Sequence, residues 1–404
     1  MDNKLKIIKN ILLGVIFYLA LFQNALEGIN GKFGNIDELL CVGLVLIALV
    51  KLVINRNVKI EHKSIYILIS IIFMLMLGFA GNFVYGYQDI KYAMKDAILM
   101  FKGLMVYISI PIVFDRFEIN DYSKSLNLQL RIIAVLTFII TVANLFLKIL
   151  PTNEVRFGFA TQQFIFSHPT YLASFGVMVI ALLSVFSKQY KNNWIYILLM
   201  SVAICLTGRT KVVVFLAVYA YIYFLVIMRS RKIGVKDIGI LSVLGSVFAA
   251  REVIVYLTHI YWARSAITIG SLRVASEHFP LGTGFGTYAS WISGEHYSAL
   301  YYKYGMEVVP GLRPDFYEFI ADTFWPMILG QFGIIGLAIF IYIIFNIYKK
   351  ITENVDIYKY FGQITLLAYM LVLSLAEASF SGPIAVIYFG IIAILSQQKI
   401  DRSK

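Results

Sequence analysis

The stretch WPMILGQFGIIGLAIFIYIIFNIY, residues 325–348, runs for 24 residues without a charged side chain. An α-helix needs about 20 apolar residues to cross the hydrocarbon core of a bilayer, so this stretch predicts a membrane-spanning helix. The rest of the chain has the same character. Of its 404 residues, 60% are hydrophobic and only 14% are charged, which is too apolar for a soluble domain of this length.

Further stretches share this length and character, so the sequence predicts about twelve spans. The predicted spans are 10–26, 37–54, 64–80, 97–114, 130–149, 168–187, 193–207, 210–228, 236–253, 325–348, 359–376 and 380–397. The expected fold class is an all-α polytopic membrane bundle. Residues 1–250 hold the first nine helices, residues 251–324 form one long outer loop, and residues 325–404 hold the last three helices.

Lysine and arginine are distributed unevenly between the two sides of this bundle. With the N-terminus inside, most of the 35 Lys and Arg residues fall on the inner side, as is typical of loops that stay in the cytoplasm. We therefore expect a protein of the cytoplasmic membrane with both termini in the cytoplasm. The net charge of +12 is mainly a topology signal, and no clustered soluble basic patch indicates nucleic-acid binding.

Some cations are predicted on the outer side, where the topology rule alone does not place them. An arginine can donate two parallel hydrogen bonds to phosphate oxygens and stays charged at any working pH. Such residues are candidates for binding an anionic substrate, and the alternative for each is a side chain that reaches lipid headgroups. The candidates are Lys102, Arg156, Arg209, Arg273 and Arg313.

The loop 251–324 is long for a simple connection, so we expect it to have a function and short helices of its own. In the segment SEHFPLGTGFG, Gly282 and Gly284 permit positive φ and allow backbone amides to approach an anion. A plain turn is the alternative explanation of these glycines. His278, just before them, is a candidate substrate contact.

Three acidic residues follow in this loop. Asp315, Glu318 and Asp322 have the spacing of one face of a short helix that Pro314 would begin. A carboxylate at the membrane edge can accept a proton from a sugar hydroxyl, so Asp322 is the first candidate for a catalytic base, with His278, Glu318 and His296 behind it. A solvated acidic face is the alternative.

Two more candidates lie at predicted helix ends on the outer side. His168 precedes Pro169 at the start of a span and either contacts substrate or caps the helix. Glu377, near the end of the span 359–376, is a functional candidate because acids at membrane depth are costly, and we expect an arginine to pair with it. The chain has no DxD motif and no metal-ligand spacing of acids or cysteines, so we expect neither a metal nor a cofactor.

Three segments together resemble a known family. They are AICLTGRTKVVVFLAVYAYIYFL (203–225), RVASEHFPLGTGFG (273–286) and LGQFGIIGLAIFIY (329–342). Their order and outer placement resemble the O-antigen ligase and polymerase superfamily, in particular the Wzy-type polysaccharide polymerases. Arg273 and Gly284 have the family's spacing between an arginine and a P-x-G-x-G loop. The resemblance covers roughly residues 155–350.

The resemblance implies a metal-independent, inverting glycosyltransferase of the integral-membrane C type. Donor and acceptor would be oligosaccharide repeat units linked to undecaprenyl diphosphate, which a polymerase joins into a surface polysaccharide. A chain-length regulator and a flippase would be further partners. Arg273, Arg209 and Arg156 would stabilise the departing diphosphate, because charge develops there in the transition state.

Two alternatives stay open. A ligase would transfer the glycan to another acceptor, but ligases carry a histidine-containing motif where this chain has Asp322 and Thr323. A transporter or flippase also has about twelve spans, with polar residues at mid-membrane. Geometry separates these classes, since an enzyme should gather Arg209, Arg273 and Asp322 around one outward cavity.

Overall fold

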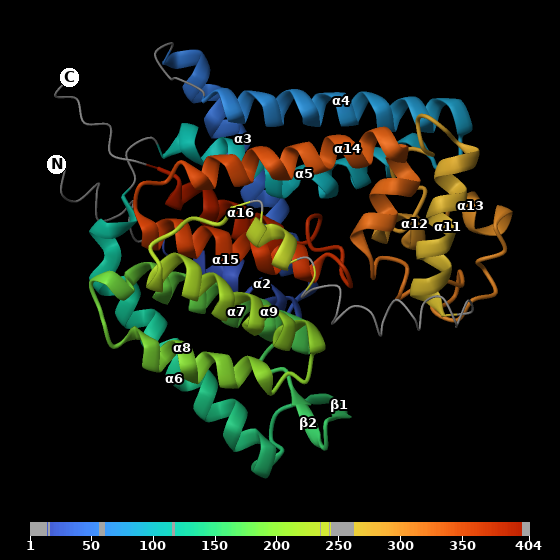
Figure 1. The fold of residues 1–404 in the computed structure, drawn as a ribbon. Coiled ribbons are helices and arrows are strands. Elements are labelled where there is room, and N and C mark those ends of the chain that lie inside the picture. The colour runs from blue at the N-terminus through green and yellow to red at the C-terminus, as the bar shows by residue number, and fades with distance from the viewer. Residues whose placement is uncertain are drawn as a thin grey trace.

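The computed structural model describes residue 14 and residues 17–55, 61–114, 118–234, 236–241, 243 and 262–397. In these residues the regular structure is helical apart from one two-stranded sheet. Figure 1 shows long helices lying side by side, with the short elements of the long loop gathered at one end. The structure thus agrees with the all-α bundle that the sequence predicts.

Among the described residues, six helices are long and apolar enough to cross a membrane. They are α4 (His62–Tyr85), α5 (Ile90–Val113), α6 with the preceding turn η2 (Ile119–Leu147), α7 with η3 (Pro169–Lys188), α9 with η4 (Thr210–Met228) and α14 (Phe324–Thr352). Within these spans α6 is Ser123–Leu147, α7 is Pro169–Val185 and α9 is Thr210–Tyr223. Each lies at a position where the sequence predicts a span.

Four other predicted spans are also helical but are shorter or more charged. They are α3 (Ile36–Ile54), α8 (Asn193–Cys205), α15 (Ile357–Leu373) and α16 (Pro383–Leu395), and α3 is preceded by α2 (Gln23–Glu27) and η1 (Gly31–Asn35). The predicted span 10–26 is helical in most of its described part, at residue 14 and over 17–21 and 23–26, whereas most of the predicted span 236–253 lies outside the described residues. The number of twelve therefore stays a prediction, and so does the orientation.

The bundle is packed around α5 and α7, which are buried along most of their length. Helix α5 lies against α3 and α16, α7 against α8 and α15, and α14 against α4 and α11 (Ala263–Glu277). Small residues permit the closest approach. A Cβ added at Gly103 of α5 would lie only 2.8 Å from Cβ of Ala385 in α16.

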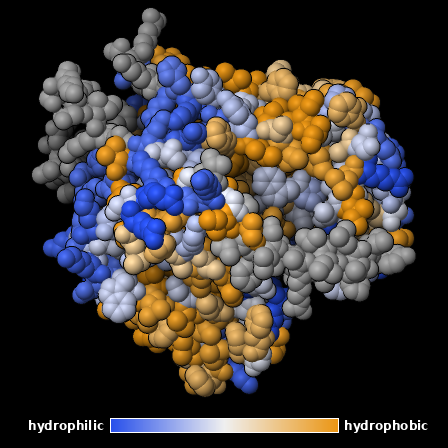
Figure 2. Space-filling model, viewed as in Figure 1, coloured by the Kyte–Doolittle hydropathy of each residue, from blue (hydrophilic) through white to orange (hydrophobic). Residues whose placement is uncertain are grey.

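The helices place different polar residues at the two ends of the bundle. At one end lie the starts of α7, α9 and α14, next to His168, Arg209 and Asp322; we call it the arginine end. At the other lie the ends of α7 and α14 and the start of α15, with Lys188, Lys350 and Lys359; we call it the lysine end. Figure 2 shows hydrophobic residues over much of the visible face and hydrophilic residues toward the left, at the lysine end.

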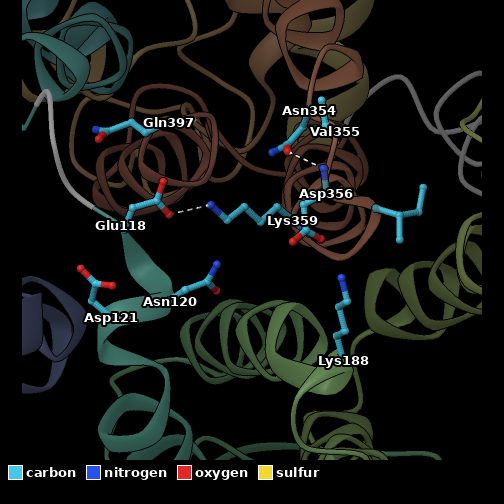
Figure 3. Close-up of a pocket in the computed structure, with 10 residues that line it drawn as sticks. Glu118, Asn120, Asp121, Lys188, Asn354, Val355, Asp356, Lys359 and Gln397 are labelled. Carbon is cyan, nitrogen blue, oxygen red and sulfur yellow. Dashed lines mark hydrogen bonds and ion pairs between the residues drawn. The ribbon is translucent and has the colours of Figure 1, made fainter. Parts of the chain in front are cut away.

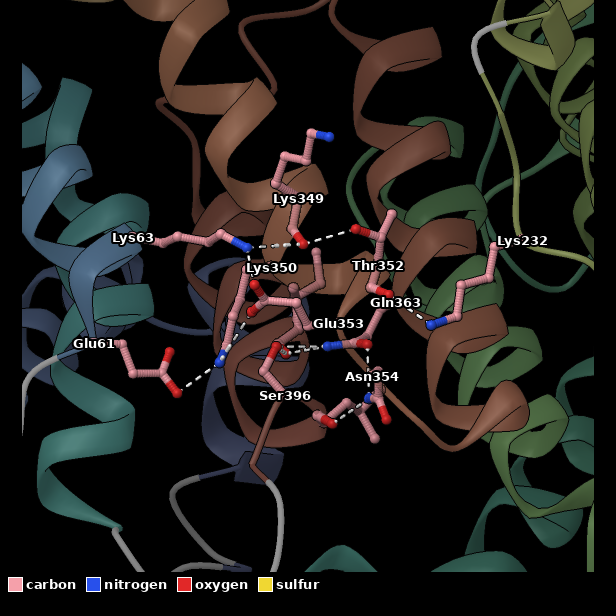
Figure 4. A network of polar contacts seen from close by, with 12 residues as sticks. Glu61, Lys63, Lys232, Lys349, Lys350, Thr352, Glu353, Asn354, Gln363 and Ser396 are labelled. Atoms are coloured by element: carbon pink, nitrogen blue, oxygen red, sulfur yellow. Dashed lines mark hydrogen bonds and ion pairs between the residues drawn. The ribbon is translucent and has the colours of Figure 1, made fainter.

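The lysine end is held by a network of polar contacts (Figure 4). The Lys350 ammonium donates to Glu61 at 2.6 Å, which links α14 to the residue before α4. Asn354 donates to Gln363 of α15 at 3.0 Å, and Gln363 donates to Ser396, after α16, at 2.7 Å. These contacts fix the ends of four helices relative to one another.

The long loop carries short helices, as expected, but not all in the predicted places. Helices α11, α12 (Trp291–Glu295) and α13 (Ala299–Lys303) lie together at the arginine end (Figure 1). The predicted helix beginning at Pro314 does not form: residues 311–322 are turns with a bridge between Arg313 and Phe316. The amide of Phe319 donates back to the carbonyl of Gly311, which is a turn contact and not a helical one.

A β-hairpin, which the sequence analysis did not anticipate, also lies at the arginine end. Strand β1 (Thr152–Arg156) pairs antiparallel with β2 (Phe159–Gln162). The turn between them has positive φ at Phe157 (52°) and Gly158 (84°), as two-residue hairpin turns often require. The amide of Gln162 donates to the carbonyl of Leu206 at 2.8 Å, which attaches the hairpin to the end of α8.

Candidate functional site

Arg209 is positioned by the tight turn between α8 and α9. Gly208 has φ +63°, and a Cβ there would lie 2.7 Å from Cγ2 of Thr161 in β2. Only glycine fits both this backbone conformation and this close approach. The turn therefore presents Arg209, the N-cap residue of α9, directly beside the hairpin.

The Arg209 guanidinium is mostly buried and only partly paired. Its side chain is 12% exposed, and Nη1 lies 3.1 Å from Oε1 of Glu154 in β1. Nη2 lies 2.9 Å from Nε2 of His168, while Nε is buried without an acceptor. Burial lowers the pKa of Arg209 from its ordinary value. A buried donor without an acceptor is costly, so this group has unused capacity to bind an anion.

His168 receives more donors than a neutral imidazole can accept. As the N-cap residue of α7, it accepts from the amide of Thr170 through Nδ1 at 3.2 Å, and the Arg209 guanidinium faces Nε2. Burial and the Arg209 charge lower the pKa of His168 to about 4, so the ring is neutral at pH 7. A neutral ring has one acceptor nitrogen. The predicted capping role of His168 is confirmed, and one nearby donor is left without a good acceptor.

Glu377 lies next to His168 and pairs with a lysine. The Lys211 ammonium is 2.6 Å from Oε1 of Glu377, and the Thr170 hydroxyl is 3.3 Å from the same oxygen. Burial raises the pKa of Glu377, but the charge and hydrogen bond of Lys211, together with the charge of Arg264, outweigh it, and the net direction is downward. The expected arginine partner is thus wrong: Lys211, on the first turn of α9, takes that position.

Asp322 pairs with an arginine that the sequence analysis did not single out. Nε and Nη2 of Arg264, on the first turn of α11, lie 3.1 and 2.9 Å from Oδ2 of Asp322. Burial raises the pKa of Asp322, and the Arg264 charge opposes this without cancelling it. A carboxylate with a raised pKa is better suited to accept a proton near neutral pH.

These pairs form one group, which we call the charge cluster. Arg264 acts electrostatically on Arg209 and Glu377, and Glu377 acts on Asp322 and His168. Its members are Glu154, Arg156, His168, Arg209, Lys211, Arg264, Asp322 and Glu377. Four cations and three carboxylates leave a net charge of +1 with His168 neutral. The sequence predictions of Arg156, His168, Arg209, Asp322 and Glu377 thus meet at one place.

Arg273 does not join the charge cluster, contrary to expectation. Its side chain is 68% exposed, and Nε lies 2.9 Å from Glu277 one turn further along α11. The guanidinium also lies over the ring of Tyr304, 5.2 Å from its centroid. Nine residues separate Arg264 from Arg273, which is about 13 Å along the helix and about half a turn around it. The expected convergence of Arg273 with Arg209 and Asp322 is wrong.

His278 is a packed residue near Arg273. It is 2% exposed, and its ring lies edge-on to Tyr85 and Tyr87. Nδ1 donates to the carbonyl of Val274 at 2.8 Å, which leaves Nε2 to accept from the Tyr87 hydroxyl at 3.1 Å. Burial lowers the pKa of His278. These contacts make it a structural support of the loop and not a substrate contact.

The glycine loop is packed internally, so the hypothesis that its amides bind an anion is wrong. Gly282, Gly284 and Gly286 do have positive φ, at 73°, 94° and 69°. However, the amides of residues 282–286 donate within the protein at 2.8 to 3.1 Å. The acceptors are the carbonyls of His278, Gly330 and Gln331 and the side chains of Asn82 and Asp96.

Lys102 is enclosed between helices and does not reach the surface. Its side chain is 2% exposed, and its ammonium pairs with Asp37 and, at 2.8 Å, with Glu38. The two acids lie on α3 and the lysine lies in the middle of α5. The prediction that Lys102 binds substrate is therefore wrong, because the bundle closes over it.

Arg313 and Glu318 lie at the surface of the loop. Arg313 pairs with Asp315 at 2.7 Å, and both side chains are exposed. Glu318 is exposed in the turns that replace the predicted helix. In the described part of the chain, the structure does not bring these residues to the charge cluster.

Three members of the charge cluster were missed as site residues, although each carried some signal. Lys211 follows the predicted outer start of the span 210–228, and Arg264 lies in the predicted outer loop, where the topology rule alone does not place a basic residue. Glu154 is two residues before Arg156, a spacing that puts both side chains on one face of a strand. Because the sequence did not predict a strand here, this spacing did not indicate that the two side chains lie together.

A cavity of about 590 Å³ opens at the lysine end, far from the charge cluster (Figure 3). It is lined by Glu118, Asn120, Asp121, Lys188, Asn354, Val355, Asp356, Ile357, Lys359 and Gln397. The Lys359 ammonium pairs with Glu118 at 3.2 Å, and the three carboxylates outnumber the two lysines. Its charge therefore suits an anionic ligand less well than the charge cluster does.

No group of three or more His, Cys, Asp or Glu side chains in the described residues is placed to hold a metal ion. A scan against protein-family models found no match, and a search of the curated proteins found no relative.

Proposed function

We propose that the charge cluster binds the diphosphate of a lipid-linked saccharide and that the protein transfers that saccharide to a second lipid-linked glycan. Repeated transfer would polymerise repeat units carried on undecaprenyl diphosphate, on the outer face of the cytoplasmic membrane. The observation that carries the proposal is Arg209, whose mostly buried guanidinium has an Nε without an acceptor inside a cluster of net positive charge. A bound anion would supply the hydrogen-bond acceptor that Nε lacks and the negative charge that the cluster lacks.

The reaction would divide the cluster into two roles. An acceptor hydroxyl oxygen forms a bond to the anomeric carbon while the bond from that carbon to the diphosphate oxygen breaks. The diphosphate leaves with the bonding electrons, and Arg209 and Arg156 stabilise its charge. The hydroxyl proton passes to a carboxylate. Asp322 suits this role because its pKa is raised. Both contacts from Arg264 are to Oδ2, so the other carboxylate oxygen, Oδ1, can accept the proton.

Glu377 differs from Asp322 in a way that supports this division. Its pKa is lowered by Lys211, whereas burial raises that of Asp322. Two neighbouring carboxyl groups whose pKa values are pushed apart commonly take separate roles in acid–base chemistry. In the proposal, Glu377 stays ionised and holds Lys211 in place, and Asp322 accepts the proton.

A transporter is the second candidate function, and one observation favours it. Lys102, Asp37 and Glu38 form a charged group within the bundle, between α3 and α5. Ionisable residues at membrane depth commonly mark ion or substrate pathways. The charge cluster lies at one end of the bundle, which suits an enzyme with one accessible face better.

The direct test is to incubate the purified protein with a defined undecaprenyl-diphosphate-linked repeat unit and separate the products by size. A polymerase gives a ladder of lengthened products. A single product on another acceptor indicates a ligase. Movement of unchanged lipid across vesicle membranes, with no new glycosidic bond, indicates a transporter. An Arg209→Ala protein that still forms the full ladder would overturn the proposal.

A further inference from the structure

The β-hairpin inserts a carboxylate between two arginines of the charge cluster. Oε1 of Glu154 lies 3.0 Å from Nε of Arg156 and 3.1 Å from Nη1 of Arg209. One carboxylate oxygen thus forms an ion pair with both guanidinium groups. A phosphate oxygen bound by the same two arginines would take the same place, because carboxylates and phosphates use the same donor geometry.

The other carboxylates of the cluster are held differently. Glu377 pairs with Lys211, and Asp322 pairs with Arg264, each in a one-to-one contact. Among the contacts of the described residues, Glu154 is the one carboxylate of the cluster that bridges two cations, and its side chain is 36% exposed. It also faces the one guanidinium of the cluster that has a buried Nε without an acceptor.

The local backbone lets the Glu154 side chain leave without unfolding the hairpin. The strand register shifts between Thr152 and Val155, and such irregularities commonly re-aim a side chain. The amide of Glu154 donates to the Thr161 hydroxyl at 3.2 Å. The hairpin itself stays attached through Gln162 and Leu206, so a change of side-chain rotamer is enough to open the position.

We propose that the Glu154 carboxylate occupies the position of the ligand's phosphate between Arg156 and Arg209. A ligand must then carry enough negative charge to displace it. This inference rests on the proposed function. A side chain tethered beside its site competes at an effective concentration in the millimolar range. A ligand with one negative charge merely replaces the charge it displaces, whereas a diphosphate brings more charge than it removes. Glu154 would thus weaken the binding of both kinds of ligand by the same factor, so that only a diphosphate, with its larger charge, still binds well.

The test compares two probes on the purified full-length protein. Inorganic pyrophosphate represents the diphosphate, and dimethyl phosphate represents a single-charged headgroup. The variant is Glu154→Gln, which keeps the size of the side chain and removes its charge. The matched control is Glu295→Gln, whose carboxylate is also 36% exposed and pairs with Lys95 at 2.9 Å, outside the charge cluster.

We expect Glu154→Gln to bind both pyrophosphate and dimethyl phosphate about tenfold more tightly than the wild type, because the same competitor is removed for each probe. Both affinities should therefore rise together in Glu154→Gln, while Glu295→Gln keeps the wild-type values. Equal affinities of the wild type and Glu154→Gln for both probes would overturn the role of Glu154. If pyrophosphate binds to neither protein, or binds Arg209→Ala as well as the wild type, the proposed anion site itself is wrong.

Discussion

Helix α11 carries two arginines that end in opposite surroundings. Arg264, on its first turn, pairs with Asp322 inside the charge cluster. Arg273, nine residues later, points to solvent, and its partners Glu277 and Tyr304 lie on the same surface. Both lie in the loop that the sequence predicts to be outside, and only the second belongs to the family-like motif.

The difference shows that packing decides which charged residues can act together. At the arginine end, the starts of α7, α9 and α11 and the β-hairpin enclose several charges, so electrostatic interactions there are strong. Around Arg273, solvent screens the charges and each contact contributes little. Arg264 and Arg209 therefore belong to the charge cluster, where we propose that the anion binds, and Arg273 belongs to a solvated surface.

The largest expected effect is on the rate of transfer when the proposed base is removed. Asp322→Asn should lower kcat by roughly 1000-fold, because a positioned general base contributes about 100- to 10,000-fold. Initial rates of ladder formation measure this. The control is Asp315→Asn, since Asp315 is exposed and paired with Arg313 on the surface of the same loop. A wild-type rate for Asp322→Asn would exclude Asp322 as the base.

The second prediction concerns the glycines that follow Arg273. A Cβ at Gly284 would overlap the backbone nitrogen of Asn82, at a φ of +94°. Gly284→Ala should therefore lower the free energy of unfolding by about 3 kcal/mol, as measured by denaturant unfolding in detergent. Gly305→Ala is the control, because Gly305 also has positive φ (+66°) but open space around it. Equal stability of the two variants would mean that this loop is not packed as described.

The third prediction uses the pKa of His168, which burial and Arg209 lower to about 4 from 6.5. Between these pH values the unfolded chain binds a proton at this residue and the folded protein does not. Stability is therefore lost as the pH falls from about 6.5 to about 4. His168→Asn keeps a capping side chain but does not titrate.

The melting temperature of the wild type should consequently fall more steeply with acidification than that of His168→Asn. Thermal unfolding across this pH range gives the comparison. Parallel curves for the two proteins would show that His168 is not held neutral by the charge cluster.

The smallest effect is expected for Arg273→Ala. An exposed side chain contributes little to stability or to a distant reaction, so the rate of ladder formation should change by less than about threefold. Its pair with Glu277 and its contact with Tyr304 are both at the surface. If Arg273→Ala folds normally but forms no polymer, Arg273 takes part in the reaction, and the difference between Arg273 and Arg264 described above is wrong.

Much of the fold could be predicted from the sequence because apolar length alone indicates a span. The prediction 325–348 matches α14, Phe324–Thr352. The break inside α14 at Gly333, where φ is +63°, was not predictable in this way. It depends on the loop around Gly282, whose added Cβ would meet the backbone of Gln331 and Gly333, far away in sequence.

The site was predictable only in part, for a physical reason. Arg209 and His168 were found because charged or polar residues at the start of a span are unusual. Which arginine of α11 meets Asp322 depends on the rotation of that helix against α14, and no local pattern encodes it. Glu154 required the hairpin, whose Phe157–Gly158 turn was present in the sequence as a weak turn pattern.

The most direct test of the central claim is the affinity of two arginine variants for undecaprenyl diphosphate, the proposed leaving group. If the charge cluster is the anion site, Arg209→Ala should bind this lipid roughly 100-fold more weakly than the wild type, and Arg273→Ala should bind it with unchanged affinity. Wild-type affinity in Arg209→Ala together with a large loss in Arg273→Ala would contradict the account.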